Sequence, residues 1–310
     1  MSHCLVVAYL AMKSVLVPAY AKVNLCLEVL GQRTDGYHEL RTIFQTITLR
    51  DTLALEASHT THIDLRIVGN SALARENGRD NLVYRALDEL RRELRFKRGV
   101  RAVLIKRIPV GRGLGGGSSD AAAALIGLLR LSGKRMEAAR LVEIAARLGA
   151  DVPFFLRGGR ALGVGRGDEI YPLPDGLRQP VLVVSPGDFA VHTRDAYQWL
   201  APRLTKPADP TKLWQFCALC WSPQGDALSN DFEAAVFPRY SRLAAIKREL
   251  LRQGAAGASL PGSGSAVFGI FRNPAKARRA ARAFPNDQVF VCSTLSRAEY
   301  RRKLGGPDFA

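Results

Sequence analysis

Residues 109–119 read Pro-Val-Gly-Arg-Gly-Leu-Gly-Gly-Gly-Ser-Ser, after the apolar, β-branched run Val100–Val110 and before the helix-forming stretch Asp120–Leu125. A glycine loop that opens a helix is an anion site, because its backbone N–H groups point at the ligand and the helix dipole favours negative charge. Glycines also let a phosphate approach closely, since they carry no Cβ atom. We therefore predict a loop that binds a phosphorylated small molecule, with Ser118 and Ser119 as hydroxyl donors at the helix start.

Other phosphate-binding loops share features with this stretch, and each differs from it. The dinucleotide pattern G-x-G-x-x-G starts at Gly111, but the acidic residue expected about 20 positions later, Glu137, stands in a helical stretch and not at a strand end. A Walker loop needs a lysine after its last glycine, and Ser118 follows Gly117. The protein-kinase loop needs a valine two positions after the third glycine of its pattern, here Gly116, but Ser118 stands at that position. It also needs the sequences His-Arg-Asp and Asp-Phe-Gly, which the chain lacks. A plain structural turn with a glycine N-cap stays open.

Composition and charge indicate a globular chain with anionic partners. Its 310 residues suffice for two domains with a substantial core, and the ordinary composition excludes disordered and collagen-like classes. The formal net charge of +17 suits a nucleotide, a phosphorylated substrate or a nucleic acid. Because the basic residues are scattered along helical stretches, we interpret them as solvated faces and expect no nucleic-acid partner. No apolar run approaches the length of a membrane span, so we expect no membrane association.

The cysteines and the N-terminal residues give indications of the cellular compartment in which the protein works. Five cysteines give no disulfide framework, and the pair Cys217 and Cys220 has no second pair at zinc spacing. We therefore predict a helical stretch with two buried thiols, no metal ligands, and a reducing, cytoplasmic environment. Residues 1–16 show no signal-peptide pattern and are interpreted as an N-terminal extension, with a translation start at Met12 as an alternative.

Hydrophobic periodicity predicts a mixed α and β chain. The first half has predicted strands over Ala21–Leu30, His38–Leu49, Thr52–Leu55 and Ile63–Val68, and helices over Asn81–Arg95, Ala121–Leu131 and Met136–Leu148. The second half has predicted strands over Leu162–Ile170, Gln179–Ser185, Ala266–Phe271 and Gln288–Cys292, and helical segments over Thr193–Leu200, Phe232–Gln253 and Pro274–Phe284. The order strand–helix–helix–strand–helix–strand of the second half is typical of an α+β sandwich.

Two charged residues stand where a lone charge would be costly. Lys22 lies with Asn24 on the opening strand, and Asp151 stands just past a helix and directly before the apolar run Val152–Phe155. A carboxylate at such a place is partly desolvated unless a cation pairs with it, and a lysine on a buried strand has the same difficulty with opposite sign. One site that holds both residues would satisfy each of them and leave an acid–base pair beside the phosphate.

The chain resembles the GHMP superfamily of small-molecule kinases. The resemblance rests on Ala21-Lys-Val-Asn-Leu25, Asp35-Gly-Tyr-His-Glu-Leu40, Gly113-Leu-Gly-Gly-Gly-Ser-Ser-Asp-Ala-Ala122, Gly149-Ala-Asp-Val-Pro-Phe-Phe155 and Pro261-Gly-Ser-Gly-Ser265, in the family's order. It implies an α+β, two-domain GHMP kinase fold, with a ribosomal-S5-like N-terminal domain over 17–162 and a C-terminal ferredoxin-like α/β sandwich over 163–310. The segment Asp35–His38 resembles the members that act on a cytidine-diphosphate-linked alcohol of the non-mevalonate isoprenoid pathway.

The resemblance implies a kinase that uses ATP and Mg²⁺ to phosphorylate the 2-hydroxyl of that alcohol. Asp151 would receive or orient the hydroxyl proton, and Lys22 would hold Asp151 ionised. In the cytidine pocket, Tyr37 would stack on the base, His38 would hydrogen-bond to it, and Thr193 and Tyr197 would form a second wall. The other implied substrate contacts are Asn24, Gly262, Ser263 and Gly264. The implied ATP contacts are Asn81 and the loop residues Pro109, Val110, Gly111, Arg112, Gly113, Leu114, Gly115, Gly116, Gly117, Ser118 and Ser119.

Alternatives remain for the residues and for the function. Asp151 could cap the segment that follows it, Lys22 could be a strand-edge charge, Thr193 could be a helix N-cap, and Gly262–Gly264 could be a bare turn. A superfamily kinase of the homoserine or mevalonate type would share the glycine loop. A basic nucleic-acid-binding protein would instead bind RNA in a salt-sensitive way. We expect a monomer or weak homodimer. Arg112 departs from the family, in which a small residue is common at its place.

Overall fold

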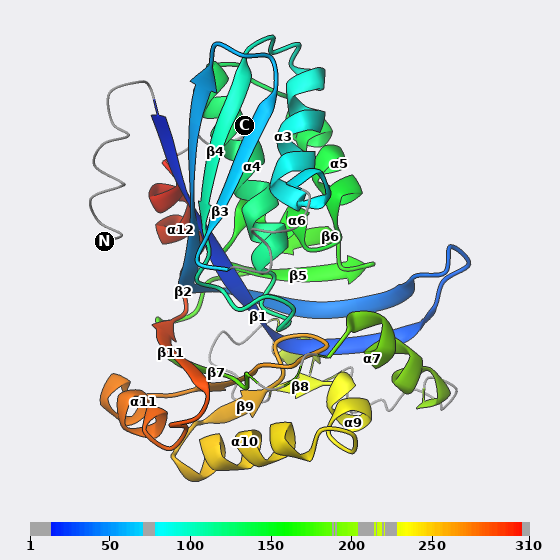
Figure 1. The fold of residues 1–310 in the computed structure, drawn as a ribbon. Helices are drawn as coiled ribbons and strands as arrows, with labels where there is room; N and C mark the ends of the chain where they lie inside the picture. Colours follow the sequence, from blue (N-terminus) through cyan, green and yellow to red (C-terminus); the bar gives the residue numbers. More distant parts are fainter. Residues whose placement is uncertain are drawn as a thin grey trace.

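Two sheets organise the structure, a computed structural model that describes residues 14–70, 78–187, 189, 191–203, 214, 216–218, 220 and 228–305 (Figure 1). The larger sheet has the order β3-β4-β2-β1-β8, with β5 paired to β2 and β6 paired to β5. Its strands are β1 (Ser14–Gln32), β2 (His38–Ser58), β3 (Ile63–Val68), β4 (Gly99–Ile105), β5 (Arg160–Gly165), β6 (Glu169–Pro172) and β8 (Ser229–Asn230).

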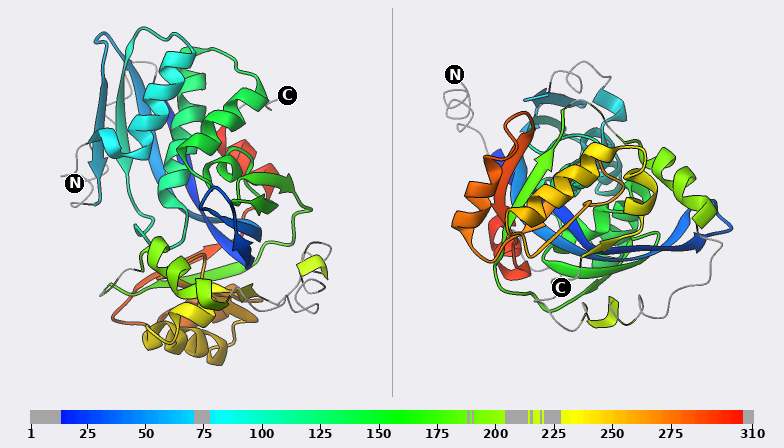
Figure 2. Two further views of the ribbon diagram at one scale, coloured as in Figure 1. Left: turned by 90° about the vertical axis from the view of Figure 1, so that its right-hand side faces the viewer. Right: turned by 90° about the horizontal axis from the view of Figure 1, so that it is seen from below.

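Helices cover one face of the larger sheet (Figures 1 and 2). They are α3 (Leu82–Glu93), α4 (Gly116–Ser132), α5 (Ala138–Leu148) and α6 (Val152–Arg157), with the 3-10 turn η1 (Gly78–Asp80) before α3. Asn81 caps α3 by accepting a hydrogen bond from the Val83 N–H at 2.9 Å. The alanine-rich face of α4 packs directly on β1 and β2 and is buried from Ser119 to Leu129.

The strands β1 and β2 are longer than predicted. The sequence predicts separate strands over His38–Leu49 and Thr52–Leu55, but β2 is one strand that continues through Arg50 and Asp51. Asp51 is fully buried and paired with Lys106, so its charge does not require a turn. β1 begins at Ser14, so residues 14–16, which the prediction assigned to the N-terminal extension, belong to the first strand; residues 1–13 lie outside the described residues.

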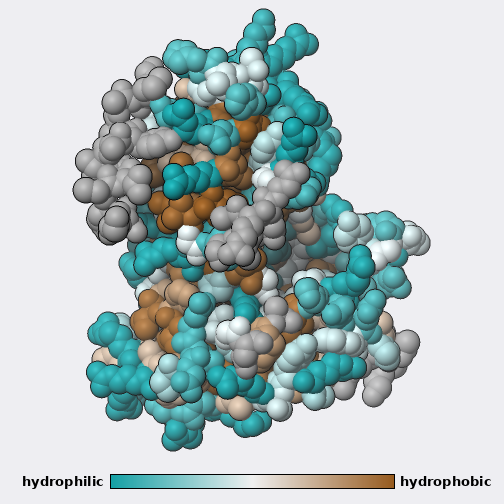
Figure 3. All heavy atoms as spheres, viewed as in Figure 1, coloured by the Kyte–Doolittle hydropathy of each residue, from teal (hydrophilic) through white to brown (hydrophobic). Residues whose placement is uncertain are grey.

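The smaller sheet is fully antiparallel and confirms the predicted ferredoxin-like sandwich. Its order is β11-β7-β10-β9, built from β7 (Pro180–Ser185), β9 (Gly257–Ser259), β10 (Val267–Ile270) and β11 (Gln288–Ser293). The helices of this half are α7 (Thr193–Leu200), η2 (Ala201–Arg203), α9 (Phe232–Val236), α10 (Ser241–Arg252) and α11 (Pro274–Ala281). Figure 1 shows α10 and α11 on the outer face of the sheet, where hydrophilic side chains face solvent in Figure 3.

Three predictions about the second half are wrong in detail. The predicted helical segment from Phe232 to Gln253 is two helices, because Pro238 has no N–H to donate to the Ala234 carbonyl. The predicted strand Leu162–Ile170 is the hairpin of β5 and β6, and the short strand β9 was not predicted. The thiols of Cys217 and Cys220 are half-buried instead of buried, and the described cysteines are unbridged.

The two halves share elements as well as a core. A third apolar cluster, which includes Val23, Ile43, Val183 and Phe268, lies between the long strands and the smaller sheet. The last helix, α12 (Arg297–Leu304), returns to the first half, where the Tyr300 hydroxyl donates to the Phe155 carbonyl at 2.5 Å. A domain boundary after residue 162 therefore falls inside β5, and the larger sheet runs on to Pro172. No described helix is long and apolar enough to cross a membrane.

Candidate active site

The glycine loop opens α4 directly. Gly115 is the N-cap in a left-handed conformation (φ 70°), and no side chain of the described residues caps the helix end, which leaves the first N–H groups for a ligand. A Cβ at Gly115 would lie 2.8 Å from the Phe155 ring and 3.0 Å from Lys22 Cγ, so only glycine fits between them. A cavity of about 350 Å³ lies along the loop; of the predicted ATP contacts, Asn81 and all residues from Pro109 to Ser118 line it.

The helix begins earlier than the sequence predicts. α4 starts at Gly116, whereas the prediction placed its start at Ala121, because packing overrides the low helix propensity of glycine. Ser118 and Ser119 therefore lie within the first turns of the helix. Ser118 lines the cavity, but Ser119 is 1% exposed and lines neither this cavity nor the larger one beside it.

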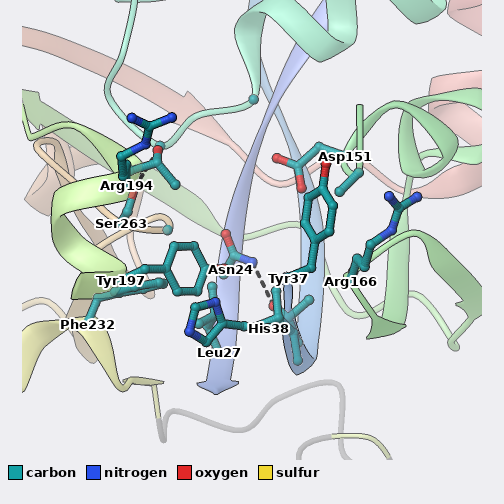
Figure 4. A pocket seen from close by; sticks show the side chains of 18 of the residues that line it. Asn24, Leu27, Tyr37, His38, Asp151, Arg166, Arg194, Tyr197, Phe232 and Ser263 are labelled. Atoms are coloured by element: carbon teal, nitrogen blue, oxygen red, sulfur yellow. Dashed lines mark hydrogen bonds between the residues drawn. The ribbon is translucent and has the colours of Figure 1, made fainter. Parts of the chain in front are cut away.

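A second, larger cavity of about 770 Å³ adjoins the first, with Gly113, Gly115 and Ser118 in the lining of both. It lies between the long β1–β2 hairpin, α7 and the turn Pro261–Ser265 (Figure 4). Both predicted catalytic residues and all but one of the predicted substrate contacts line it: Lys22, Asp151, Asn24, Tyr37, His38, Thr193, Tyr197, Gly262 and Ser263. Gly264 is the exception.

Lys22 lines the larger cavity next to Gly115, which lines both cavities. Lys22 is 4% exposed, and its ammonium donates to Asn24 Oδ1 at 2.7 Å and to the Pro261 carbonyl at 3.3 Å. Asp151 Oδ2 lies 3.5 Å from the same nitrogen. These acceptors satisfy a cation that burial would otherwise disfavour, so a strand-edge role does not describe Lys22.

Asp151 stands at the N-cap position of α6, yet its carboxylate accepts no capping hydrogen bond there. Its side chain is 32% exposed and faces the larger cavity, as Figure 4 shows. The Asp151 side chain therefore does not cap α6. A partly exposed carboxylate that faces a cavity can accept a proton from a hydroxyl bound there.

Aromatic side chains form the far wall of the larger cavity. The rings of His38 and Tyr197 are stacked, with centroids 4.4 Å apart, and Phe232 meets Tyr197 edge-on at 4.8 Å. Burial lowers the pKa of His38 below its ordinary value and raises the pKa of Tyr197 well above its own. Both are consequently neutral near pH 7. Thr193 is not an N-cap, since His192 holds that position; its hydroxyl contacts Ser263 Oγ at 3.1 Å.

The turn Pro261–Ser265 is held by a residue that the sequence did not single out. Asn230 is buried on the short strand β8, and its amide donates to the carbonyls of Leu260 at 2.9 Å and Gly262 at 2.8 Å. A Cβ at Gly113 would lie 2.8 Å from the Pro261 carbonyl, so the glycine loop and this turn are in close contact. Asn230 belongs to no predicted motif, which explains why its role was not foreseen.

A buried ionic cluster lies beneath the glycine loop. Lys106 Nζ is 2.5 Å from Asp51 Oδ2 and 2.7 Å from Asp120 Oδ2, and each of the three residues is at most 7% exposed. Asp51 Oδ1 also accepts the Ile108 N–H at 2.8 Å. Burial, partly offset by Lys106, raises the pKa of Asp120 well above its ordinary value. The cluster fixes the strand before the loop to the helix after it.

Arg112 connects the glycine loop to the second half of the chain. Its guanidinium donates to the Phe189 carbonyl and, at 2.5 Å, to Ser265 Oγ, and its own carbonyl accepts the Ala266 N–H at 3.4 Å. The side chain thus spans from the loop to the turn Pro261–Ser265. Two further arginines that the sequence did not single out, Arg166 and Arg194, line the larger cavity.

Comparisons with known proteins agree with this architecture. The family model of the GHMP kinases N terminal domain matches residues 81–159, and that of the GHMP kinases C terminal domain matches residues 213–289. A 4-diphosphocytidyl-2-C-methyl-D-erythritol kinase of Solibacter usitatus is 46% identical over 290 residues, which is 91% of this chain and 89% of the relative. One from Gloeobacter violaceus is 38% identical over 293 residues, with 91% and 95% covered.

Solved structures also match this fold. A crystal structure of 4-(cytidine 5'-diphospho)-2C-methyl-D-erythritol kinase matches with a TM-score of 0.75 at 36% identity, and 90% of this chain and 98% of that chain are covered. A homoserine kinase from Cytophaga hutchinsonii matches with a TM-score of 0.71 at 20% identity, with 92% and 96% covered. At that identity the second likeness concerns the fold alone.

Proposed function

The chain belongs to the GHMP kinases and, within them, to the family of the 4-diphosphocytidyl-2-C-methyl-D-erythritol kinases, and from this membership we propose its reaction. The protein is a phosphotransferase with an alcohol acceptor. It transfers the γ-phosphoryl group of ATP to the 2-hydroxyl of 4-diphosphocytidyl-2-C-methyl-D-erythritol, in the non-mevalonate route to isoprenoid precursors. The cytoplasmic location expected from the cysteines stays a prediction.

The observation that carries the reaction is the pairing of Lys22 and Asp151 in the larger cavity, with Nζ and Oδ2 3.5 Å apart, next to the loop residue Gly115 that lines both cavities. The smaller cavity lies along a helix N-terminus suited to a triphosphate. The larger one has an aromatic wall suited to a base. The acid–base pair lies in the larger cavity on the side of the shared glycine loop, where a γ-phosphoryl group and an acceptor hydroxyl would meet.

Phosphoryl transfer needs mainly positioning and electrostatic stabilisation from the protein. Asp151 accepts the proton of the 2-hydroxyl as that oxygen bonds to the γ-phosphorus, and the bond from phosphorus to the β,γ-bridging oxygen breaks to release ADP. Lys22 pairs with the carboxylate and offsets negative charge that develops beside it. The uncapped N–H groups at the start of α4 hold the phosphates.

ATP is the donor in this family, and Mg²⁺ is proposed with it. Asp120 Oδ1 is buried and has no hydrogen-bond partner among the described residues, and Asp120 lines the ATP cavity. Oxygen donors of this kind suit Mg²⁺, which binds through one or two protein oxygens plus phosphates and water. Bound there, Mg²⁺ would neutralise triphosphate charge. Among the described residues no group of three or more histidine, cysteine or acidic side chains could hold a metal without a nucleotide.

Tyr37 is proposed as the platform on which the cytosine base stacks. We expect Tyr37→Ala to raise the KM for the cytidyl substrate by roughly 5- to 150-fold, since base–aromatic stacking contributes about 1–3 kcal/mol. The KM for ATP should stay unchanged, because Tyr37 lines only the larger cavity. Steady-state kinetics measures both constants. Tyr37→Phe keeps the ring and should behave like wild type; an equal loss in both variants would rule out stacking.

Arg112 is proposed to hold the triphosphate loop in its binding conformation. We expect Arg112→Ala to raise the KM for ATP on the order of tenfold, because hydrogen bonds from a charged donor contribute about 1.5–3 kcal/mol each. Arg135→Ala removes an exposed arginine that follows α4 and serves as the matched control. If both variants kept the wild-type KM for ATP, the contacts of Arg112 would have no part in nucleotide binding.

The identity of the product tests the proposed chemistry. Phosphorus NMR of a reaction with ATP and 4-diphosphocytidyl-2-C-methyl-D-erythritol should show one new phosphomonoester signal that grows as ADP forms, with the substrate's diphosphate signals retained. Carbon–phosphorus coupling should place the new group on the 2-hydroxyl. Release of inorganic phosphate without a new ester would mean that water, and not the substrate, is the acceptor.

A further inference from the structure

Arg166 lines the large cavity from the turn between β5 and β6, and nothing in the proposed reaction uses it. The turn Gly165-Arg-Gly-Asp168 is built tightly, with Gly165 at φ 67° and Gly167 at φ 91°, where other residues would be strained. A Cβ at Gly165 would lie 2.9 Å from Glu169 Oε1. Because Gly165 pairs with Leu40 of β2, this turn lies beside the β1–β2 turn that carries Tyr37.

The Arg166 guanidinium contacts two partners, the Asp168 carboxylate and the Tyr37 ring. Its Nε and one terminal nitrogen lie 3.0 and 2.5 Å from Asp168 Oδ2, and its Cζ lies 4.9 Å from the centroid of the Tyr37 ring. A guanidinium at this distance is attracted to the face of an aromatic ring. The chain Asp168–Arg166–Tyr37 therefore links a rigid hairpin turn to the ring that faces the cavity.

Among the described residues, the Tyr37 side chain makes no hydrogen bond and no ring contact besides the one with Arg166. The Tyr37 N–H donates to Asp35 Oδ1 at 3.0 Å, which fixes its backbone, but 56% of the residue is exposed. In Figure 4, Arg166 lies on the side of Tyr37 that is turned away from His38 and Tyr197. One face of the ring is thus covered by the guanidinium, and the other is left toward the cavity.

We propose that Arg166, anchored by Asp168, is a positioning residue that holds the Tyr37 ring in place so that a pyrimidine base stacks on its opposite face. This inference rests on the proposed function, in which Tyr37 is the base platform. A ring that is already ordered loses less conformational freedom when the base binds, so the effect falls on substrate affinity and not on the chemical step. Arg166 then selects for a planar base without touching it.

A double-mutant cycle tests this role. Arg166→Met keeps the length of the side chain and removes its charge, and we expect the KM for the cytidyl substrate to rise roughly 3- to 10-fold, from the size of cation–π interactions. The kcat and the KM for ATP should stay within about twofold of wild type. In the Tyr37→Ala background the same change should have almost no effect, because Arg166 acts through the ring. Asp168→Asn should show a smaller loss in the same direction.

Arg194 supplies the matched control, since Figure 4 places it across the cavity beside Ser263. Any effect of Arg194→Met should persist in the Tyr37→Ala background. If the effect of Arg166→Met also persists there, Arg166 contacts the substrate directly and the proposal is overturned. A loss of kcat or of ATP affinity would overturn it too, in favour of a structural role, as would wild-type kinetics in Arg166→Met. A wild-type protein that does not turn over the cytidyl substrate would instead refute the proposed function.

A comparison of cytidine with cytidine diphosphate shows whether Arg166 contributes to binding of the base or of the diphosphate. We expect Arg166→Met to weaken binding of cytidine and of cytidine diphosphate by the same factor in calorimetric titrations, because the ring recognises only the base. A loss confined to cytidine diphosphate would assign Arg166 to the diphosphate and overturn the positioning role.

Discussion

Asp151→Asn should lower kcat by roughly 10²- to 10⁴-fold, the usual effect of removing a general base. Asparagine keeps the shape of the side chain but cannot accept the hydroxyl proton. Lys22 would retain Asn24 Oδ1 at 2.7 Å and the Pro261 carbonyl at 3.3 Å, so the fold around it should persist. Steady-state assays should show the loss in kcat, with the two KM values changed far less.

The control for this variant is Asp64→Asn, which removes an exposed carboxylate on β3, away from both cavities. It should have wild-type kinetics, and both variants should have the wild-type far-ultraviolet circular dichroism. Wild-type turnover in a folded Asp151→Asn protein would show that this carboxylate neither accepts nor orients the proton.

The second large effect is expected on stability. Lys106→Met should lower the free energy of unfolding by about 3–5 kcal/mol near neutral pH, because it leaves two buried carboxylates without their cation. Asp51 would keep the Ile108 N–H, but Asp120 Oδ1 already lacks a hydrogen-bond partner among the described residues. Urea denaturation followed by circular dichroism measures the loss.

The stability deficit of Lys106→Met should depend on pH in a defined direction. Burial raises the pKa of Asp120 above its unfolded value of 3.8, so protonation favours the folded state. Removal of Lys106 takes away the cation that opposes this shift. The deficit of Lys106→Met should therefore shrink as the pH is lowered from about 8 to about 5.

The double variant Lys106→Met with Asp120→Asn should recover part of the lost stability at neutral pH, because one buried charge is removed with the cation. A deficit that grew on acidification, or a double variant less stable than Lys106→Met, would contradict the cluster's role.

The sequence predicted the fold class correctly because the motifs of the chain lie in a known family order and the second half has a clear strand and helix order. It also suggested that Lys22 and Asp151 share a site, since each charge alone would be costly to bury. The structure places them 3.5 Å apart. Such reasoning works where two residues of opposite charge would each be costly to bury alone and can pair with one another.

Other features depend on contacts between distant segments and have no local pattern. The sequence predicted two strands where β2 is one, and nothing local shows that Asp51 can be buried within it, because its partner Lys106 becomes its neighbour only when β2 pairs with β4. Arg166 and Asn230 stand in no motif, and their roles arise from the turn and the short strand that carry them. The helix start at Gly116 was missed because tertiary packing decides it, and not the propensity of glycine.

The most direct test of the account is turnover of competing substrates by the wild-type protein. ADP formation should be measured by a coupled assay with ATP and, in turn, 4-diphosphocytidyl-2-C-methyl-D-erythritol, homoserine and mevalonate. We predict saturable turnover with the cytidyl substrate and no turnover above background with the other two. Turnover of homoserine or mevalonate, with none of the cytidyl substrate, would contradict the assignment of the larger cavity to a cytidine diphosphate.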